Sequence, residues 1–109
     1  PGGDNISPIK IENYLNKSDY IEQSLVYGDN KPYLVSLIVL KSEYKNINEE
    51  KIKEEIEKIN KDLSKIEKIK KFIIINDQFT IENGMMTPTL KLKRYKIIQK
   101  YKNEFEKLY

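Results

Sequence analysis

The chain has 109 residues, of which 39% are hydrophobic and 34% charged, and its formal net charge is +3. This length fits one domain with one modest core. Acidic and basic residues interleave, so the charge balance does not indicate a nucleic-acid partner. The sequence has no Cys and no His, which excludes disulfides, thiolate zinc sites and catalysis through a Ser–His or Cys–His pair.

The ends and the hydropathy of the chain also set expectations. No apolar run approaches the roughly 20 residues that cross a bilayer, and no signal-peptide pattern opens the sequence. We therefore expect a cytoplasmic protein. The Gly-rich opening "PGGDN" has no element before it, which predicts that the chain starts inside a longer protein.

The first predicted elements are a helix and a β-hairpin. Ser7 suits a helix N-cap, and Pro8 suits the first helical position, where its missing N–H costs nothing. Residues 20–28 alternate in polarity, and residues 33–40 are nearly all apolar, as in a central strand buried on both faces. The side chains expected to face inward are Ile11, Tyr14 and Leu15 on the helix and Ile21, Leu25 and Tyr27 on the first strand.

From Asn48 the pattern changes to that of a helix. One long helix or two abutting short ones would place an apolar stripe on one side. A stripe of this length also fits a short coiled coil, although docking onto the hairpin is favoured because the repeat is short. Residues 71–76 form a third strand, and a crossover helix favours parallel pairing with a right-handed connection. The stripe consists of Ile52, Ile56, Ile59, Leu63 and Ile66.

The last third of the chain begins with a long loop, "DQFTIENGMMTPTLK", in which Asn83-Gly84 predicts a tight turn. Loops of this length in a compact domain are usually functional or disordered. Residues 94–109 then form an amphipathic helix with Ile98, Tyr101, Phe105 and Leu108 on one stripe. The predicted fold class is α+β: a small three-stranded mixed sheet, made of an antiparallel hairpin and one further strand, packed by about three helices.

Three segments in this order carry a resemblance to a known family: "GGDNISP", "GDNKPYLVSLIVL" and "FTIENGMMTPTLKLKR". Together they make the whole chain, residues 1–109, similar to the small C-terminal lid domain of AMP-forming acyl-CoA synthetases, with the long-chain fatty acid branch most alike. The resemblance implies a large N-terminal domain, absent from this chain, that holds the ATP and acyl pockets. The lid domain alone is then expected to be inactive.

The resemblance implies a two-step ligase. A fatty acid carboxylate attacks the α-phosphate of ATP, and the thiol of CoA then displaces AMP to give a thioester. Mg²⁺ enters with ATP, and no pair of acidic residues in this chain has a spacing suited to hold it. The lid presents a lysine for the first step and a Gly-containing loop for the second. A long-chain substrate is compatible with peripheral contact between the full enzyme and a membrane.

The implied site residues lie in two places. The family's usual run is a small residue, Gly, Lys, two residues and Arg, and residues 89–94 match it with Lys91 as the adenylation lysine and Arg94 in the basic position. Leu90 stands where many relatives have Gly, and Lys93 is the competing candidate for the catalytic amine. The opening loop, which would face CoA or AMP, consists of Gly2, Gly3, Asp4 and Asn5. Gly3 is the strongest candidate there, because Gly has no Cβ to obstruct a ligand.

Two other classes of protein fit parts of the sequence. A small basic nucleic-acid-binding module could stack bases on Tyr27 and Tyr33 and bind phosphates through lysines 91–103. Only one Arg occurs in the chain, and acidic residues interleave with the lysines, which disfavours this class. A protein-interaction module, dimeric through the long helix, is the second alternative.

Overall fold

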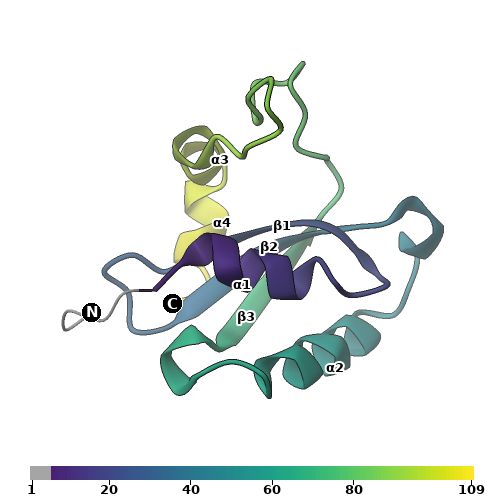
Figure 1. The fold of residues 1–109 in the computed structure, drawn as a ribbon, viewed down its shortest axis with the longest axis vertical. Coiled ribbons are helices and arrows are strands. Elements are labelled where there is room, and N and C mark those ends of the chain that lie inside the picture. Colours follow the sequence, from purple (N-terminus) through teal and green to yellow (C-terminus); the bar gives the residue numbers. More distant parts are fainter. Residues whose placement is uncertain (1–5) are drawn as a thin grey trace.

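The computed structural model describes residues 6–109. A three-stranded sheet with the strand order β1-β2-β3 lies at its centre, and helices pack on both faces of the sheet (Figure 1). Strands β1 and β2 are antiparallel and strands β2 and β3 are parallel, which confirms the predicted mixed sheet. In chain order the elements are α1 (Pro8–Leu15), β1 (Ile21–Tyr27), β2 (Leu34–Leu40), the 3-10 helix η1 (Ser42–Tyr44), α2 (Glu49–Asn60), the 3-10 helix η2 (Lys65–Glu67), β3 (Ile69–Ile75), α3 (Arg94–Lys100) and α4 (Lys102–Glu106).

Each face of the sheet is covered by its own hydrophobic cluster. Helices α1 and α2 pack on one face, and helices α3 and α4 pack on the other together with residues of the loop after β3. All residues of β2 are buried, as expected for a central strand covered on both sides. The fully buried side chains include Ile11, Leu15, Ile38 and Ile52 in the α1–α2 cluster and Leu25, Leu37, Ile97 and Phe105 in the α3–α4 cluster.

The first helix begins as its sequence predicts. The backbone N–H of Lys10 donates to Ser7 Oγ at 3.3 Å, and Pro8 is the first helical residue. Ile11 and Leu15 are fully buried against the sheet. The helix ends at Leu15, and its N-cap and inner face were predicted from local sequence.

The alternation predicted for β1 breaks near the start of the strand. Leu25 and Tyr27 belong to the α3–α4 cluster, whereas Ile21 packs in the α1–α2 cluster. The register between β1 and β2 shifts between Ile21 and Gln23. One extra residue reverses the face of every side chain beyond it, so the prediction that Ile21 shares a face with Leu25 and Tyr27 was wrong.

The second helix is shorter than the full apolar stripe. It ends at Asn60, whose side-chain amide donates to the carbonyl of Ile69 and accepts from the N–H of Ile69, each at 2.9 Å. A new turn, η2, then follows, with Ser64 as its N-cap and a capping box that Glu67 completes. This restart changes the phase of the stripe, and Ile66 is therefore 43% exposed, so its assignment to the core was wrong.

Glu67 supports a testable pH dependence. The Lys10 ammonium, 3.0 Å from Glu67 Oε2, and the hydroxyl and N–H of Ser64 hold the pKa of this carboxyl below its usual 4.5. Because the folded pKa is the lower one, this stabilisation is present above pH 4.5 and is lost as the pH falls through the folded value. Urea unfolding should show that the Glu67→Gln variant loses less stability than the wild type between about pH 6 and about pH 3.

A matched control is available on α2, where Glu57 is exposed. The Glu57→Gln variant should lose stability with falling pH as the wild type does, because an exposed carboxylate gains little from folding. Equal pH dependence in the wild type and in Glu67→Gln would show that the Lys10–Glu67–Ser64 contacts do not stabilise the fold.

The predicted terminal helix is divided in two. Tyr101 leaves the helical conformation at φ −103° and ψ 19°, and α4 continues from Lys102 at a new angle (Figure 1). The four stripe residues still reach the α3–α4 cluster, joined by the fully buried Ile97. The fold therefore has four α-helices in its described part instead of about three. None of the helices within residues 6–109 is long and apolar enough to cross a membrane.

Candidate functional site

Lys91 lies at the end of a very tight hairpin in the loop that follows β3. Met86 and Leu92 pair across this hairpin as an antiparallel bridge. The N–H of Thr87 donates to the carbonyl of Lys91 at 2.8 Å, and the N–H of Leu90 donates to the carbonyl of Thr87 at 2.8 Å. The N–H of Lys91 also donates to Thr87 Oγ1 at 3.1 Å. The backbone from which the Lys91 side chain projects is thus held on both sides.

The residue before Lys91 has a left-handed backbone. Leu90 has φ 64°, the conformation that the last residue of a three-residue hairpin loop usually adopts. Such a conformation favours Gly, because a Cβ costs roughly 1–2 kcal/mol there. Leu90, which departs from the Gly of the family's usual run, therefore occupies a position that requires a left-handed backbone. The side chain is 66% exposed and contributes little packing in return.

This strain gives a prediction for Leu90→Gly. We expect the free energy of unfolding to rise by about 1 kcal/mol, because the relief of left-handed strain exceeds the entropic cost of Gly. Leu90→Ala keeps a Cβ at the same φ and should bring no such gain. Chemical denaturation of both variants and the wild type measures the difference. A lower stability for Leu90→Gly than for Leu90→Ala would contradict the assignment of strain.

The two candidate lysines differ in their surroundings. The side chain of Lys91 is exposed, whereas Lys93 is half-buried at the N-cap position of α3, where its N–H donates to the carbonyl of Met85 at 2.8 Å. Among the described residues, the ion pairs involve neither amine. Lys91 is therefore the lysine that a partner outside this domain can reach more easily.

The loop that carries Lys91 is fastened to β1 by Gln23. Its side-chain amide donates to the carbonyl of Phe79 at 2.9 Å and accepts from the N–H of Phe79 at 2.8 Å. The ring of Phe79 is buried in the α3–α4 cluster. These two hydrogen bonds to one backbone residue resemble the pairing between neighbouring strands. They fix the position of the loop at Phe79, close to β1.

The predicted turn at Asn83-Gly84 is present and organises the middle of the loop. Gly84 has φ 79°, and Asn83 Oδ1 accepts from the N–H groups of Thr80 and Met85, each at 3.0 Å. The carbonyl of Thr80 also accepts from the N–H groups of Met85 and Met86. A loop of this length is thereby an ordered structure with its own hydrogen bonds.

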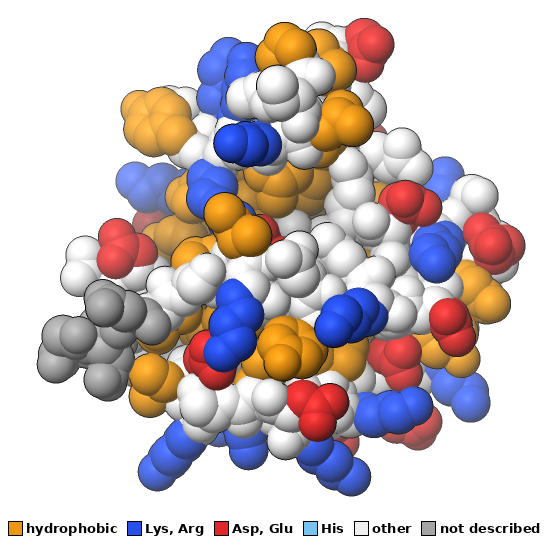
Figure 2. Space-filling view, in the orientation of Figure 1, with side chains coloured by type: hydrophobic (Ala, Val, Ile, Leu, Met, Phe, Trp, Pro, Cys, Tyr) orange, Lys and Arg blue, Asp and Glu red, His pale blue; other side chains and the backbone are white. Residues whose placement is uncertain are grey.

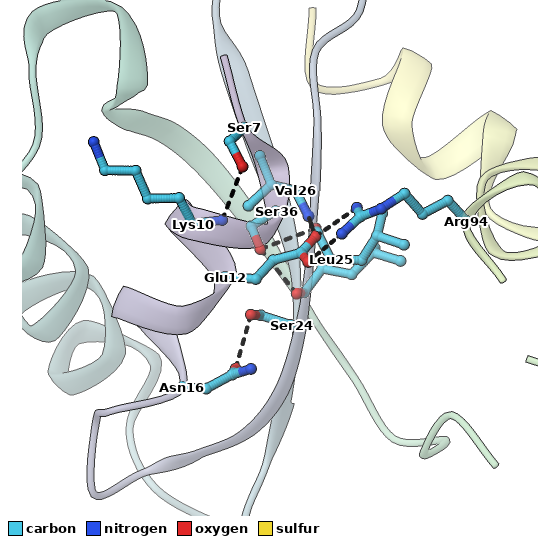
Figure 3. A network of polar contacts seen from close by, with 10 residues as sticks. Ser7, Lys10, Glu12, Asn16, Ser24, Leu25, Val26, Ser36 and Arg94 are labelled. Atoms are coloured by element: carbon cyan, nitrogen blue, oxygen red, sulfur yellow. Dashed lines mark hydrogen bonds and ion pairs between the residues drawn. The ribbon is translucent and has the colours of Figure 1, made fainter. Parts of the chain in front are cut away.

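Arg94, the predicted residue of the basic position, forms a two-armed ion pair with Glu12 of α1. Its Nη1 donates to Glu12 Oε2 at 2.7 Å, and its Nη2 donates to Glu12 Oε1 (Figure 3). Glu12 Oε2 also accepts from the N–H of Val26 at 2.7 Å. The guanidinium therefore points toward α1 and β1 in this structure, and contact with a ligand stays a prediction.

Sequence reasoning placed neither Glu12 nor Gln23 at the site. Glu12 is only 5% exposed because it lies beside Ile11 on the inner side of α1. A buried acidic residue on an apolar helix face, in a chain with a single Arg, is the signal that could have found this pair. Gln23 carried no comparable signal, because its partner is a backbone group.

The other predicted site residues, Gly2, Gly3, Asp4 and Asn5, lie outside the described residues. In the sequence they directly precede Ile6 and the N-cap Ser7 of α1. Across residues 6–109, acidic side chains do not gather in a group that could hold a metal ion.

The tyrosines proposed for base stacking are engaged inside the domain. Tyr27 stacks on Phe105 with ring centroids 4.5 Å apart, and Tyr33 stacks on Tyr109 at 4.8 Å. The hydroxyl of Tyr33 also donates to the carbonyl of Leu108. Charges of both signs are scattered over the face in Figure 2. These contacts disfavour a nucleic-acid-binding surface around the hairpin.

Comparison with known proteins matches this fold and this sequence. Residues 2–109 match the family model described as the AMP-binding enzyme C-terminal domain, and the chain belongs to that family. It is 35% identical over 98% of its length to the chloroplastic long-chain-fatty-acid–[acyl-carrier-protein] ligase of Arabidopsis thaliana, and 30% identical over 99% to a long-chain-fatty-acid–CoA ligase of Mycobacterium tuberculosis. It spans only 16% and 22% of these two relatives.

Solved structures of other proteins contain a domain with the same fold. The adenylation domain of a carboxylate reductase from Mycobacterium chelonae superposes with a TM-score of 0.88 at 26% identity, over 99% of this chain and 18% of that one. A carboxylic acid reductase domain from Segniliparus rugosus, solved with AMP and a co-purified carboxylic acid, gives 0.86 at 29% identity over 99% of this chain and 18% of that one. The predicted three-stranded α+β fold is thereby confirmed.

Proposed function

We propose that residues 1–109 are the mobile lid domain of an AMP-forming long-chain fatty acid:CoA ligase, and that Lys91 is its adenylation lysine. The observation that carries this proposal is the exposed Lys91 side chain at the end of an ordered hairpin, in a chain of the AMP-binding C-terminal family. The large N-terminal domain of the same enzyme is the proposed partner. It would hold ATP with its Mg²⁺ and the fatty acid.

In the first step, a carboxylate oxygen of the fatty acid forms a bond to the α-phosphorus of ATP, and the bond to pyrophosphate breaks. Negative charge builds on the phosphate oxygens as this happens. The Lys91 ammonium stabilises that charge when the lid holds it beside the carboxylate and the phosphate. Lys suits the task because its charge is compact and its stem is long, and no proton transfer to or from it is needed.

In the second step, a thiolate attacks the acyl carbon of the adenylate and AMP leaves with the bonding electron pair. The lid turns so that the Gly2–Asn5 loop faces the acyl-adenylate, and Lys91 moves away from the reaction centre. The acceptor is CoA in this proposal. Since one relative is a ligase for acyl-carrier protein, an assay should offer both thiol acceptors.

The test compares the full-length protein with the 109-residue domain. The full-length protein should consume ATP and a long-chain fatty acid and release AMP, pyrophosphate and acyl-CoA. The domain alone should bring no acceleration, because its described part holds no Walker-type phosphate loop and no metal-binding cluster. Chromatography of the acyl products measures both reactions. A full-length protein that forms neither acyl-adenylate nor thioester would overturn the proposal.

A further inference from the structure

The Glu12–Arg94 ion pair connects the two functional segments of the proposed lid. Arg94 is the first residue of α3 and follows Lys91 by three positions. Glu12 lies on α1, the helix that comes directly after the opening loop. From this placement we infer that Glu12 is a positioning residue for adenylation: it fixes the Lys91 hairpin through Arg94. The inference rests on the proposed role of Lys91.

The geometry of the pair restricts direction as well as distance. Both terminal nitrogens of the Arg94 guanidinium donate to different oxygens of one carboxylate, and such a planar fork sets orientation in a way that a single contact does not. The carboxylate is itself held by the N–H of Val26 on β1 at 2.7 Å. Figure 3 shows this chain of contacts running from β1 through Glu12 to Arg94.

The connection from Arg94 to Lys91 is short and well defined. Leu92 pairs with Met86 in the hairpin bridge, and the N–H of Lys93 donates to the carbonyl of Met85. Fixing Arg94 therefore fixes the base of the hairpin that carries Lys91. The other end of the loop is fastened by Gln23 to Phe79. Buried Ile97 packs α3 against the sheet, and the ion pair adds a directional contact at the first residue of α3.

In this inference Glu12 acts by fixing the position of the Lys91 hairpin, and not through its own charge. A misplacement of about 1 Å of a reacting group can lower a rate by roughly a hundredfold. A buried ion pair is by itself weak support for stability, since apolar side chains of similar volume often serve as well. The directional fork is thus better explained by a need for orientation than by a need for stability.

The experiment uses the full-length protein and measures the two half-reactions separately. Glu12→Gln should lower the kcat of adenylate formation roughly tenfold to a hundredfold, with little change in the KM for ATP. Conversion of supplied acyl-adenylate to thioester should change less than about twofold, because Lys91 is away from the reaction centre in that step. Arg94→Lys keeps the charge but cannot form the fork, and it should give the same selective loss.

Two controls separate positioning from general destabilisation. Ile56→Val on α2 removes one buried methylene of the opposite cluster and should lower thermal stability without a selective loss of adenylation. In a Lys91→Ala background, Glu12→Gln should lower adenylation no further, because its effect passes through Lys91. This dependence on Lys91 is the readout that a merely structural role would not reproduce.

The inference is overturned if Glu12→Gln lowers both half-reactions equally, leaves adenylation unchanged, or has its full effect in the Lys91→Ala background. Should Glu12→Gln not yield folded protein, the same criteria apply to Arg94→Lys. Failure of the proposed function is distinguishable, because Lys91→Ala alone would then spare adenylation.

Discussion

Replacing Lys91 by Ala in the full-length protein should lower the rate of adenylate formation roughly 10²–10³-fold, by analogy with the loss of one donor from an oxyanion hole. The Lys91 side chain is exposed, so the variant should fold with unchanged stability. Conversion of supplied acyl-adenylate to thioester should be largely spared. Fatty-acid-dependent exchange between ATP and pyrophosphate measures the first step, and release of AMP from acyl-adenylate and CoA measures the second.

Lys93→Ala is the matched control for this prediction. Lys93 is two residues away, carries the same charge and is half-buried at the start of α3. We expect less than about a tenfold loss of adenylation for it, since the half-buried residue is less accessible to a partner domain than the exposed Lys91. A larger loss for Lys93→Ala than for Lys91→Ala would transfer the role to Lys93, and equal loss of both half-reactions in Lys91→Ala would reject an adenylation lysine there.

Local sequence predicted those parts of the fold that depend on local forces. The Ser7 cap and the apolar run of β2 each reflect a preference that a few neighbouring residues determine. The turn at Asn83-Gly84 is of the same kind. The mixed sheet followed from the order of strand, helix and strand.

The features of the fold that the sequence did not predict depend on contacts between different segments of the chain. The register shift in β1 places Ile21 on the opposite face, and nothing in the order of residues 20–28 requires it. The side chain of Asn60 bonds to Ile69 and ends α2 there, which interrupts a stripe that appeared continuous. Glu12 and Arg94 are 82 positions apart, so pattern reasoning over one helix could not pair them.

The candidate site also contains residues that the sequence predicted and residues that only the structure revealed. Lys91 was predicted from one motif and its catalytic role stays a prediction, whereas the hairpin that carries it came from the structure. Gln23 and Glu12, which hold the loop and the start of α3, came only from the structure. The proposed lid presents a different segment in each of two orientations, and a domain that turns in this way has to move as one body. Contacts that tie α1, β1 and the Lys91 loop together are what such a motion requires.

Phe105→Ala should destabilise the domain by about 3–5 kcal/mol, a large part of the 5–15 kcal/mol typical of a native domain. The ring of Phe105 is 1% exposed and stacks on Tyr27 of β1 with centroids 4.5 Å apart. Its loss leaves a cavity between α4 and the sheet. Urea unfolding should show a lower midpoint with an unchanged slope.

Tyr95→Ala on α3, where the side chain is 78% exposed, is the control, and its free energy of unfolding should stay within about 0.5 kcal/mol of the wild type. Comparable losses for the two variants would mean that Phe105 does not hold α4 to the sheet.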